Sequence, residues 1–472
     1  MRFSISGAVA LILAACAPPA PGQSLLPPAP KDPTGFAAGA DVIAQRIALK
    51  PNLARAKNIV LMVGDGMGVS TITAGRIYAG QKLGKLGEEH SLTFERLPYA
   101  ALIKTYNTDQ QVSDSAGTAT AMVTGLKTRA GVINTAPSVR RGNCPDALKN
   151  PLPTLTQQAI ALGKAAGVVS SARLTHATPA VMYAVSADRN WESDKTTPDA
   201  AKDAGCTAIA RQLVEGKHGL MVAMGGGARA FDEDMMDRWP GAVVTTKADM
   251  TVAQQTPLLG LFAPSHLPYT LEKAAASTAP SLADMTNKAL SLLAQSGDGF
   301  FLMVEGGRID HGHHAGKAAL ALEELRAFDD AVAVVLERVD LANTLVLVTA
   351  DHSHTFTIAG YPKRGNDILG PVYYNDPSGE TDGILALARD GRPYTTLGYM
   401  NGPGAKDGVR DPSQVPPGTI TRQPALIPFT SETHAGEDVA LFAAGPWAHL
   451  VGGVMEQHVI YHLMAHALGL AP

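Results

Sequence analysis

Charge is scarce in this sequence, and no stretch of it is strongly basic. Charged residues make up 17% of the 472 residues, the formal net charge is −4, and Lys and Arg form no run. A protein that binds nucleic acid needs a basic surface along the phosphate backbone, so we expect no nucleic-acid partner. The 47 Gly and 32 Pro residues exceed ordinary usage without reaching low complexity. The chain should therefore be globular and rich in loops.

Long hydrophobic runs are also lacking, apart from one at the N-terminus. Residues 1–16 read MRFSISGAVALILAAC, and this apolar stretch is too short to stay in a membrane, so it is typical of an export signal. The residues before Cys16 resemble the lipobox of bacterial lipoproteins, which implies cleavage there and a lipid on the Cys16 sulfur. An ordinary cleaved signal with an incidental cysteine is the alternative.

These features predict how the chain is divided and where it goes. We expect a signal peptide over 1–15, a Pro-rich tether over 16–35 and one large folded domain over 36–472. The protein should be exported to the periplasm or cell surface, and it should touch the membrane only through the lipid on Cys16.

Cysteine is rare as well, with three residues in the chain. Once Cys16 is set aside, Cys144 and Cys206 remain as an even pair in an exported protein. An oxidising compartment makes an unpaired exposed thiol a liability, so we predict a disulfide that closes about 60 residues. Two buried free thiols are the alternative.

Short apolar runs alternate with helical patterns along the rest of the chain. Leu325, Phe328 and Val332 repeat on one face of a helix, and Ser281 with Asp284 is typical of a capping box. This alternation predicts a doubly wound α/β fold, with a mostly parallel central sheet covered by helices on both faces. The expected strands are 59–63, 168–170, 300–304, 344–349 and 439–443.

One segment departs from this rhythm. Residues 358–430 carry many Gly, Pro, Asn and Tyr residues with little periodicity. We interpret this segment as a subdomain inserted at the surface, serving as a lid or an interface.

Carboxylates and imidazoles follow three of the apolar runs. Asp65 follows the first, Glu305, Asp310 and His314 follow the run at 300–304, and Asp351 with His352 follows the run at 344–349. In an α/β sheet such side chains meet at the carboxyl edge, where ligands bind. Each cluster alone could be structural, but together they predict metal binding with ligands suited to zinc, and two ions rather than one.

The 14 histidines are not equally informative. His458, His462 and His466 lie four residues apart on the C-terminal helix, but no carboxylate accompanies them. We interpret them as part of an amphipathic, partly exposed helix rather than as a metal site.

Ser115 stands in the segment VSDSAGTAT, where small residues suit the first turn of a helix. The free N–H groups of such a turn favour an anion, so the serine could hold a phosphate, or attack it if a cation lowers its pKa. A simple helix cap is the alternative.

Several motifs together are similar to those of the alkaline phosphatase family. They are GDGMG at 64–68, DSAGTATAMVTG at 114–125, HATP at 176–179, DRNW at 188–191, VEGGRIDHGHH at 304–314, TADHSH at 349–354 and ETHAGEDVALFAAGP at 432–446. The resemblance covers about residues 34–470 in unbroken order. It is closer to the animal-type enzymes than to the best-known bacterial form, because HATP and IDHGHH are the animal-type variants.

The resemblance implies three metal sites and several residues that contact phosphate. One zinc ion would be held by Asp310, His314 and His434, and a second by Asp65, Ser115, Asp351 and His352. Magnesium would be held by Asp65, Thr178 and Glu305, with His176 near a magnesium-bound water. Arg189 would clamp phosphate, and His311 would reach it through water.

The resemblance also implies the reaction. Ser115 would attack phosphate monoesters and form a covalent phosphoserine, which water then hydrolyses. A phosphodiesterase or sulfatase of the same superfamily is the nearest alternative enzyme, and a non-catalytic lipoprotein that scavenges phosphate or zinc is the alternative of another class.

The resemblance bears on three further features of the chain. Cys144 and Cys206 fall where animal-type enzymes have a disulfide. Ala263 and Ala279 stand where acidic calcium ligands should fall, so we expect no calcium site. The insertion at 358–430 corresponds to the family's crown, and a homodimer is expected. Residues 36–50 could form a helix that embraces the partner subunit, or simply a helix on the core of their own chain.

Overall fold

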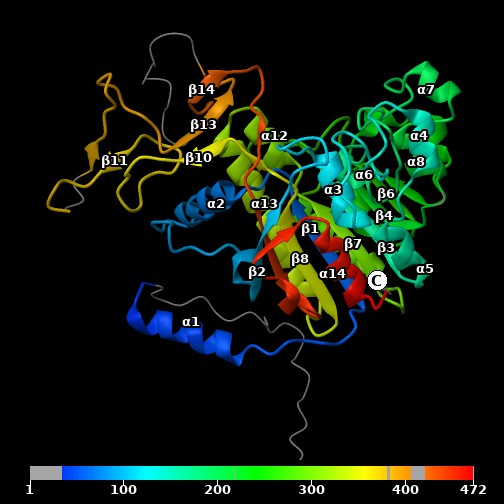
Figure 1. Cartoon of the computed structure of the whole chain (residues 1–472), viewed down its shortest axis with the longest axis horizontal. Coiled ribbons are helices and arrows are strands. Elements are labelled where there is room, and N and C mark those ends of the chain that lie inside the picture. The colour runs from blue at the N-terminus through cyan, green and yellow to red at the C-terminus, as the bar shows by residue number, and fades with distance from the viewer. Residues whose placement is uncertain (1–33, 217, 380–382, 406–419, 471–472) are drawn as a thin grey trace, which may run out of the picture.

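A ten-stranded sheet forms the centre of the computed structural model, which describes residues 34–216, 218–379, 383–405 and 420–470 (Figure 1). Its strand order is β17-β2-β16-β8-β1-β7-β3-β4-β6-β5. Among these ten strands, β16 alone runs antiparallel to its neighbours, and the others are parallel to one another. The predicted mostly parallel sheet is therefore confirmed.

The strands of this sheet include all five that the apolar runs predict. They are β1 (Asn58–Gly64), β2 (Tyr99–Lys104), β3 (Ala165–Arg173), β4 (Leu220–Gly226), β5 (Ala242–Val244), β6 (Leu258–Leu261), β7 (Phe300–Glu305), β8 (Thr344–Ala350), β16 (Val439–Ala444) and β17 (Val454–Glu456).

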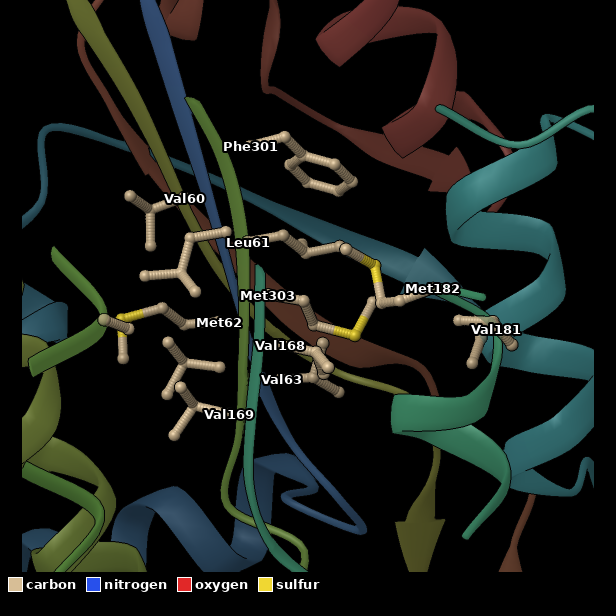
Figure 2. Packing of buried hydrophobic residues seen from close by; sticks show 14 of the residues in the cluster. Val60, Leu61, Met62, Val63, Val168, Val169, Val181, Met182, Phe301 and Met303 are labelled. Carbon is tan, nitrogen blue, oxygen red and sulfur yellow. The ribbon is translucent and has the colours of Figure 1, made fainter. Parts of the chain in front are cut away.

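The central strands are buried on both faces, because the residues on each side of the sheet are apolar. Every residue of β7 and β8 is buried, as is β1 after Asn58. Figure 2 shows Val60 and Met62 on one face of the sheet, and Leu61 and Met303 on the other, where they meet Met182. Continuous apolar strands of this kind need a helical layer on each side.

Two groups of helices supply these layers. On one face α13 (Ala318–Arg338) contacts α2 (Val69–Lys82) and α11 (Leu282–Leu293). On the other face α3 (Ser115–Thr124) contacts α5 (Leu155–Ala161), α6 (Ala177–Ala180) and α14 (Val459–Ala467) (Figure 1). The predicted covering of both faces is confirmed. The remaining helices of four residues or more are α1 (Phe36–Ala48), α4 (Cys144–Lys149), α7 (Asp199–Asp203), α8 (Ile209–Glu215), α9 (Glu233–Asp237), α10 (Lys247–Val252) and α12 (Arg308–His314).

Local signals in the sequence mark two helices correctly. Ser281 and Asp284 form the predicted capping box of α11. Leu325, Phe328 and Val332 of α13 are fully buried, as their spacing predicts. Such helices gain most of their stability from packing an apolar face.

The segment from 358 to 430 is built differently from the rest. β10 (Phe356–Ile358), β13 (Leu397–Gly402) and β14 (Ala425–Pro428) form a three-stranded sheet, and β11 (Tyr373–Tyr374) pairs with β12 (Ile384–Leu385). In Figure 1 these strands, coloured yellow to orange, lie beyond α2 and α12, away from the central sheet. Ile368, Leu369 and Leu397 pack in one cluster with residues of α2 and α13.

The disulfide between Cys144 and Cys206 is present, with Cα atoms 5.9 Å apart, which confirms the prediction. None of the described helices is long and apolar enough to cross a membrane. The predicted signal peptide, Cys16 and most of the tether lie in residues 1–33, outside the described residues.

Candidate metal centre and active site

The register of the parallel strands brings the predicted carboxylates together at one edge of the sheet. Gly64 of β1 is paired with Ala350 of β8, so Asp65 and Asp351 follow side by side. Glu305 ends β7 opposite Val63 and Ser170. This edge is the carboxyl end of the sheet, where α/β proteins bind ligands.

His434 reaches the same edge from the opposite chain direction. It lies in the short strand β15 (His434–Ala435), which pairs with β9 (Ser353–His354) and precedes β16. Because β16 runs antiparallel to β8, its amino end lies where the parallel strands end. A ligand 120 residues away from His314 in sequence therefore joins the cluster.

The first ligand set combines one carboxylate with two imidazoles. Asp310 Oδ1 lies 3.2 Å from His314 Nε2 and 3.4 Å from His434 Nε2, and the two Nε2 atoms are 3.1 Å apart. Asp310 and His314 lie on one face of α12, as their spacing of four predicts. The three atoms converge as the ligands of one ion do.

Backbone carbonyls set the orientation of both imidazoles. His314 Nδ1 lies 2.5 Å from the Glu432 carbonyl oxygen, and His434 Nδ1 lies 2.8 Å from the Ser113 carbonyl oxygen. A carbonyl accepts only from a protonated Nδ1, so in the neutral form of each imidazole Nε2 is the nitrogen left to bind a metal ion. This is the usual arrangement around a metal-binding histidine.

The second ligand set surrounds His352. Its Nε2 lies 3.4 Å from Asp65 Oδ1, 3.3 Å from Asp351 Oδ2 and 3.1 Å from Ser115 Oγ. Asp351 Oδ1 accepts hydrogen bonds from the N–H groups of Gly66 and His352, each 2.9 Å long. The other oxygen of Asp351 therefore faces Asp65 and His352.

The third set is rich in oxygen. Ligand atoms of Asp65, His176 and Glu305 lie within 4.8 Å of one another. The sequence analysis expects His176 to contact a water molecule bound to magnesium. In the structure its ring lies close enough to Asp65 and Glu305 to be a ligand itself. Thr178 follows at the start of α6 and is fully buried.

Buried polar atoms without partners test whether divalent ions fit here. Both carboxylate oxygens of Asp65, together with Asp351 Oδ2, Glu305 Oε1 and Thr178 Oγ1, are buried without a hydrogen bond. Burying such groups uncompensated is costly. Buried oxygens without a hydrogen-bond partner are suited to a cation, so the residues fit the ions that the sequence predicts.

The ionisation of these carboxyl groups is strongly perturbed. Burial, with Asp351 and Asp310 nearby, raises the pKa of Asp65 well above its usual value. Burial also raises the pKa of Glu305 to about 7, although the Ser170 hydroxyl donates to it. A divalent ion would reverse both effects, because it favours the carboxylate form.

Ser115 is the first residue of α3, which confirms the predicted helix start. Asp114 caps this helix by accepting from the N–H of Gly117, and it also accepts from Arg189 Nη1 at 3.1 Å. Asp114 therefore ties the arginine to the helix that carries the serine. The Arg189 Nη2 atom lies 3.0 Å from His176 Nε2.

Ser115 and Arg189 open into one cavity of about 280 Å³. The cavity is lined by polar side chains, which suits a small anion better than an apolar ligand. His311 lines the cavity too, and burial lowers its pKa to about 3, so it is neutral at ordinary pH. The other lining residues are Arg173, His176, Asn190, Glu192, Asp310, His314 and His434.

Three residues of the cluster, Asp114, His354 and Glu432, carry roles that the sequence did not suggest. Asp114 holds Arg189, as described above. His354 joins Asp310 Oδ1 at 2.9 Å to Glu432 Oε2 at 2.6 Å. All three lie inside the motifs quoted above, one or two residues from a predicted ligand. This closeness in sequence to a ligand was the feature from which a supporting role could have been predicted.

Gly66 has a specific reason to be glycine. Its φ is +69°, in the left-handed region, and a Cβ there would overlap the His354 ring. The GDGMG motif thus lets the chain turn between Asp65 and the imidazole of His354.

Other candidate residues lie away from the cluster. His462 and His466 are exposed on α14, as expected for an amphipathic helix. At the place where calcium ligands would fall, the carbonyl of Ala279 accepts from Lys273 Nζ at 2.6 Å.

Fold and site together define the class: an α/β enzyme with clusters of ligands suited to divalent ions at the carboxyl edge of its sheet. The chain belongs to the alkaline phosphatase family, whose model matches residues 56–470. It is therefore a phosphoric monoester hydrolase of a metal-dependent family.

Relatives support the predicted kinship with animal enzymes. The chain is 40% identical to an alkaline phosphatase of Gadus morhua, covering 88% of this chain and 92% of that protein. It is also 40% identical to the tissue-nonspecific isozyme of Gallus gallus, covering 95% and 92%. A cold-active alkaline phosphatase structure from Shewanella sp. is 26% identical, with a TM-score of 0.64, covering 87% and 99%.

Proposed function

We propose that this enzyme hydrolyses phosphate monoesters through a covalent phosphoserine on Ser115, with two zinc ions and one magnesium ion bound. The observation that supports this best is the cavity that Ser115 and Arg189 both line, with Ser115 Oγ 3.1 Å from the proposed zinc ligand His352 Nε2. The proposed ligands are Asp310, His314 and His434 for one zinc ion, Asp65, Ser115, Asp351 and His352 for the other, and Asp65, Thr178 and Glu305 for magnesium.

When bound, the ions would supply positive charge that lowers the pKa of the Ser115 hydroxyl and of a water molecule, and that stabilises the departing oxygen. The imidazole nitrogens and carboxylates of the first two sets suit zinc, whereas the oxygens of the third suit magnesium. His176 would stay close to the third ion.

In the first half-reaction, Ser115 Oγ gives up its proton and attacks phosphorus. The bond from Oγ to phosphorus forms as the ester bond breaks, and the alcohol leaves with a proton. Arg189 holds two phosphate oxygens with its planar fork, while Asp114 keeps that fork in place. The positive end of the α3 helix dipole stabilises the same negative charge.

In the second half-reaction, water attacks the phosphoserine from the side that the alcohol has left. The bond between phosphorus and Ser115 Oγ breaks, the serine regains a proton, and inorganic phosphate leaves. His311, neutral and lining the cavity, would contact phosphate through a water molecule. The site grips phosphate rather than the alcohol, so we expect many monoesters to be substrates.

Trapping the intermediate tests this proposal. Acid quenching after exposure to labelled monoester should leave label on Ser115, and Ser115→Ala should keep its metals but lose most turnover. Hydrolysis by Ser115→Ala near the wild-type rate would contradict the covalent mechanism. Faster hydrolysis of diesters than of monoesters would favour the phosphodiesterase alternative.

The identity of the ions is tested separately. Metal analysis and anomalous scattering on the purified protein should show two zinc ions and one magnesium ion per chain. Chelation should abolish activity, and zinc with magnesium should restore it. Restoration by calcium alone would show that the proposed ligand assignment is wrong.

We also propose a homodimer in which α1 contacts the partner subunit. Phe36 is 96% exposed, Ile43 60% and Ile47 80%, and exposed apolar side chains gathered on one helix suit contact with another subunit. Arg46 contacts the carbonyl of Pro98. Replacing Phe36 and Ile47 with serine should shift the protein toward monomer in sedimentation experiments, and an unchanged dimer would exclude this role. The inserted segment would serve as the crown beside the dimer axis.

Export and lipid attachment at Cys16 complete the proposal. Mass spectrometry of the protein from membranes should show a chain that begins at a lipidated Cys16. A soluble chain that lacks the signal but carries no lipid would favour the ordinary signal peptide.

A further inference from the structure

An ion pair in the wall of the active-site cavity has no part in the proposed mechanism. Arg173 is the last residue of β3, and Glu192 lies in the loop that carries Arg189. Both side chains line the cavity that contains Ser115. A charged pair here faces the same space as the substrate.

The carboxylate of Glu192 occupies the fork of the Arg173 guanidinium. Arg173 Nε donates to Glu192 Oε2 at 2.7 Å, and Arg173 Nη2 donates to Oε1 at 2.6 Å. The Thr175 hydroxyl donates to Glu192 Oε2 at 2.5 Å and fixes the carboxylate further. The two side chains are only 14% and 19% exposed, so water screens their charges weakly.

This fork is the group with which arginine binds phosphate in a bidentate way. Glu192 occupies the Nε and Nη2 donors of Arg173, and His266 Nε2 lies against the remaining Nη1. The carboxylate of Glu192 therefore fills the one side of the guanidinium that could hold an anion, and its charge repels a second anion. Without that carboxylate, the same wall would carry a net positive charge. The negative charge of Glu192 therefore decides whether this wall of the cavity repels or binds a second anionic group.

We propose that Arg173 is a second anion-binding residue of this pocket and that the Glu192 carboxylate occupies its guanidinium. The enzyme therefore selects monoesters whose alcohol carries no second anionic group. This inference rests on the proposed function, because it takes the scissile phosphate to lie between Ser115 and Arg189. It makes Glu192 a specificity determinant.

A purely structural role for the pair predicts a different result. Glu192 could simply tie the Arg189 loop to β3, and its loss would then affect all substrates alike. Asp188 offers a matched control, because it holds the same loop from outside the cavity. It accepts from Arg141 Nη2 at 2.8 Å and from Nε at 3.0 Å.

Kinetics with matched substrates separates the two roles. Propane-1,3-diol monophosphate and bisphosphate have leaving alcohols with the same three-carbon chain, which ends in a hydroxyl in the first and in a second phosphate in the other. We expect Glu192→Gln to raise the ratio of kcat/KM for bisphosphate over monophosphate by about tenfold. Adding Arg173→Gln should remove the gain, and Glu192→Asp should keep the wild-type ratio.

Asp188→Asn should lower both rates together and leave the ratio unchanged. A ratio in Glu192→Gln that equals the wild-type ratio, or that moves no more than in Asp188→Asn, would overturn the inference. Thermal unfolding of each holoenzyme confirms that the variants are folded.

Calorimetric binding of inorganic phosphate and methylenediphosphonate to the holoenzymes gives a readout without turnover. Glu192→Gln should strengthen methylenediphosphonate binding about tenfold relative to phosphate. If the wild type hydrolyses no monoester but this binding ratio still shifts, the proposed function fails and the role of Glu192 stands. If monoesters are hydrolysed but neither ratio shifts, the role of Glu192 fails alone.

Discussion

The two ends of the polar cluster are built in opposite ways. At the nitrogen-rich end, His314 and His434 surround Asp310, and backbone carbonyls orient both imidazoles. At the oxygen-rich end, Asp65 and Glu305 are buried with oxygens that accept no hydrogen bond. The protein fixes the orientation of the ligands at the nitrogen-rich end. At the oxygen-rich end it leaves the negative charge of the carboxylates without compensation.

This difference means that the two ends contribute to metal binding in different ways. Preoriented imidazoles lower the cost of binding an ion, because they need little rearrangement. Unbalanced carboxylates instead make the metal-free protein less stable, and an ion relieves that cost. We therefore expect changes at the nitrogen-rich end to alter activity and metal affinity, and changes at the oxygen-rich end to alter stability as well.

The largest effect should come from Asp310→Asn. This change removes the carboxylate that the imidazoles of His314, His354 and His434 share. We expect monoester hydrolysis to fall by at least about 100-fold and one zinc ion to be lost. Metal analysis alongside kcat measures both. Full zinc content with low activity would show that Asp310 acts in another way.

A smaller loss should follow Glu432→Gln, which weakens the support behind Asp310. Glu432 accepts from the N–H and hydroxyl of Thr355, each at 2.7 Å, and contacts His354 Nδ1. We expect zinc affinity to fall about 10- to 100-fold, as for other residues behind a metal ligand. Competition with a chelator measures the affinity, with the exposed Glu437→Gln as the control. Equal affinity in the two variants would exclude this positioning role.

At the oxygen-rich end, Glu305→Gln should change the pH dependence of stability. Folding raises the pKa of Glu305 from 4.5 to about 7, so the metal-free protein loses stability as pH rises through that interval. The loss is roughly 3 kcal/mol, and it is fully present above pH 7. The glutamine variant should lack it.

Urea unfolding of both metal-free proteins between pH 4 and 8 tests this. The free-energy difference in favour of Glu305→Gln should grow with pH, and magnesium should stabilise the wild type more. A difference that does not vary with pH would show that Glu305 does not titrate in this way.

The smallest effect should come from His462→Ala on α14. His462 is exposed and lies outside the ligand clusters of the described residues. We expect metal content and activity to stay unchanged and stability to shift by less than about 0.5 kcal/mol. Loss of metal in this variant would place a further site on the C-terminal helix.

The buried strands β1, β7 and β8 were the easiest elements to predict. The apolar runs of β1, β7 and β8 lie within a residue of the expected bounds, because such strands need apolar residues on both sides. β2 alternates buried and exposed residues, and β5 and β17 are three residues long. Strands this short leave little periodic signal, so pairing with neighbours decides them.

The site was predictable where a ligand directly follows a buried strand. Asp65, Asp351 and Glu305 can be placed from the strands alone, since parallel strands end at one edge. His434 cannot, because its place depends on β16 running antiparallel. Asp114 and Glu432 also escaped prediction, because their partners are distant in sequence and a lone carboxylate looks the same in a cap or a loop.

The sequence by itself determined the family, the strand cores and the residue types that meet at the carboxyl edge, because these depend on local hydrophobic patterns and motifs. Only the tertiary structure decided which atoms converge. Strand register, the reversed direction of β16 and the backbone carbonyls behind His314 and His434 set those distances. The pairing of Arg173 with Glu192 likewise depends on a loop folding back onto β3. Interactions between residues far apart in sequence exist only once the chain is packed.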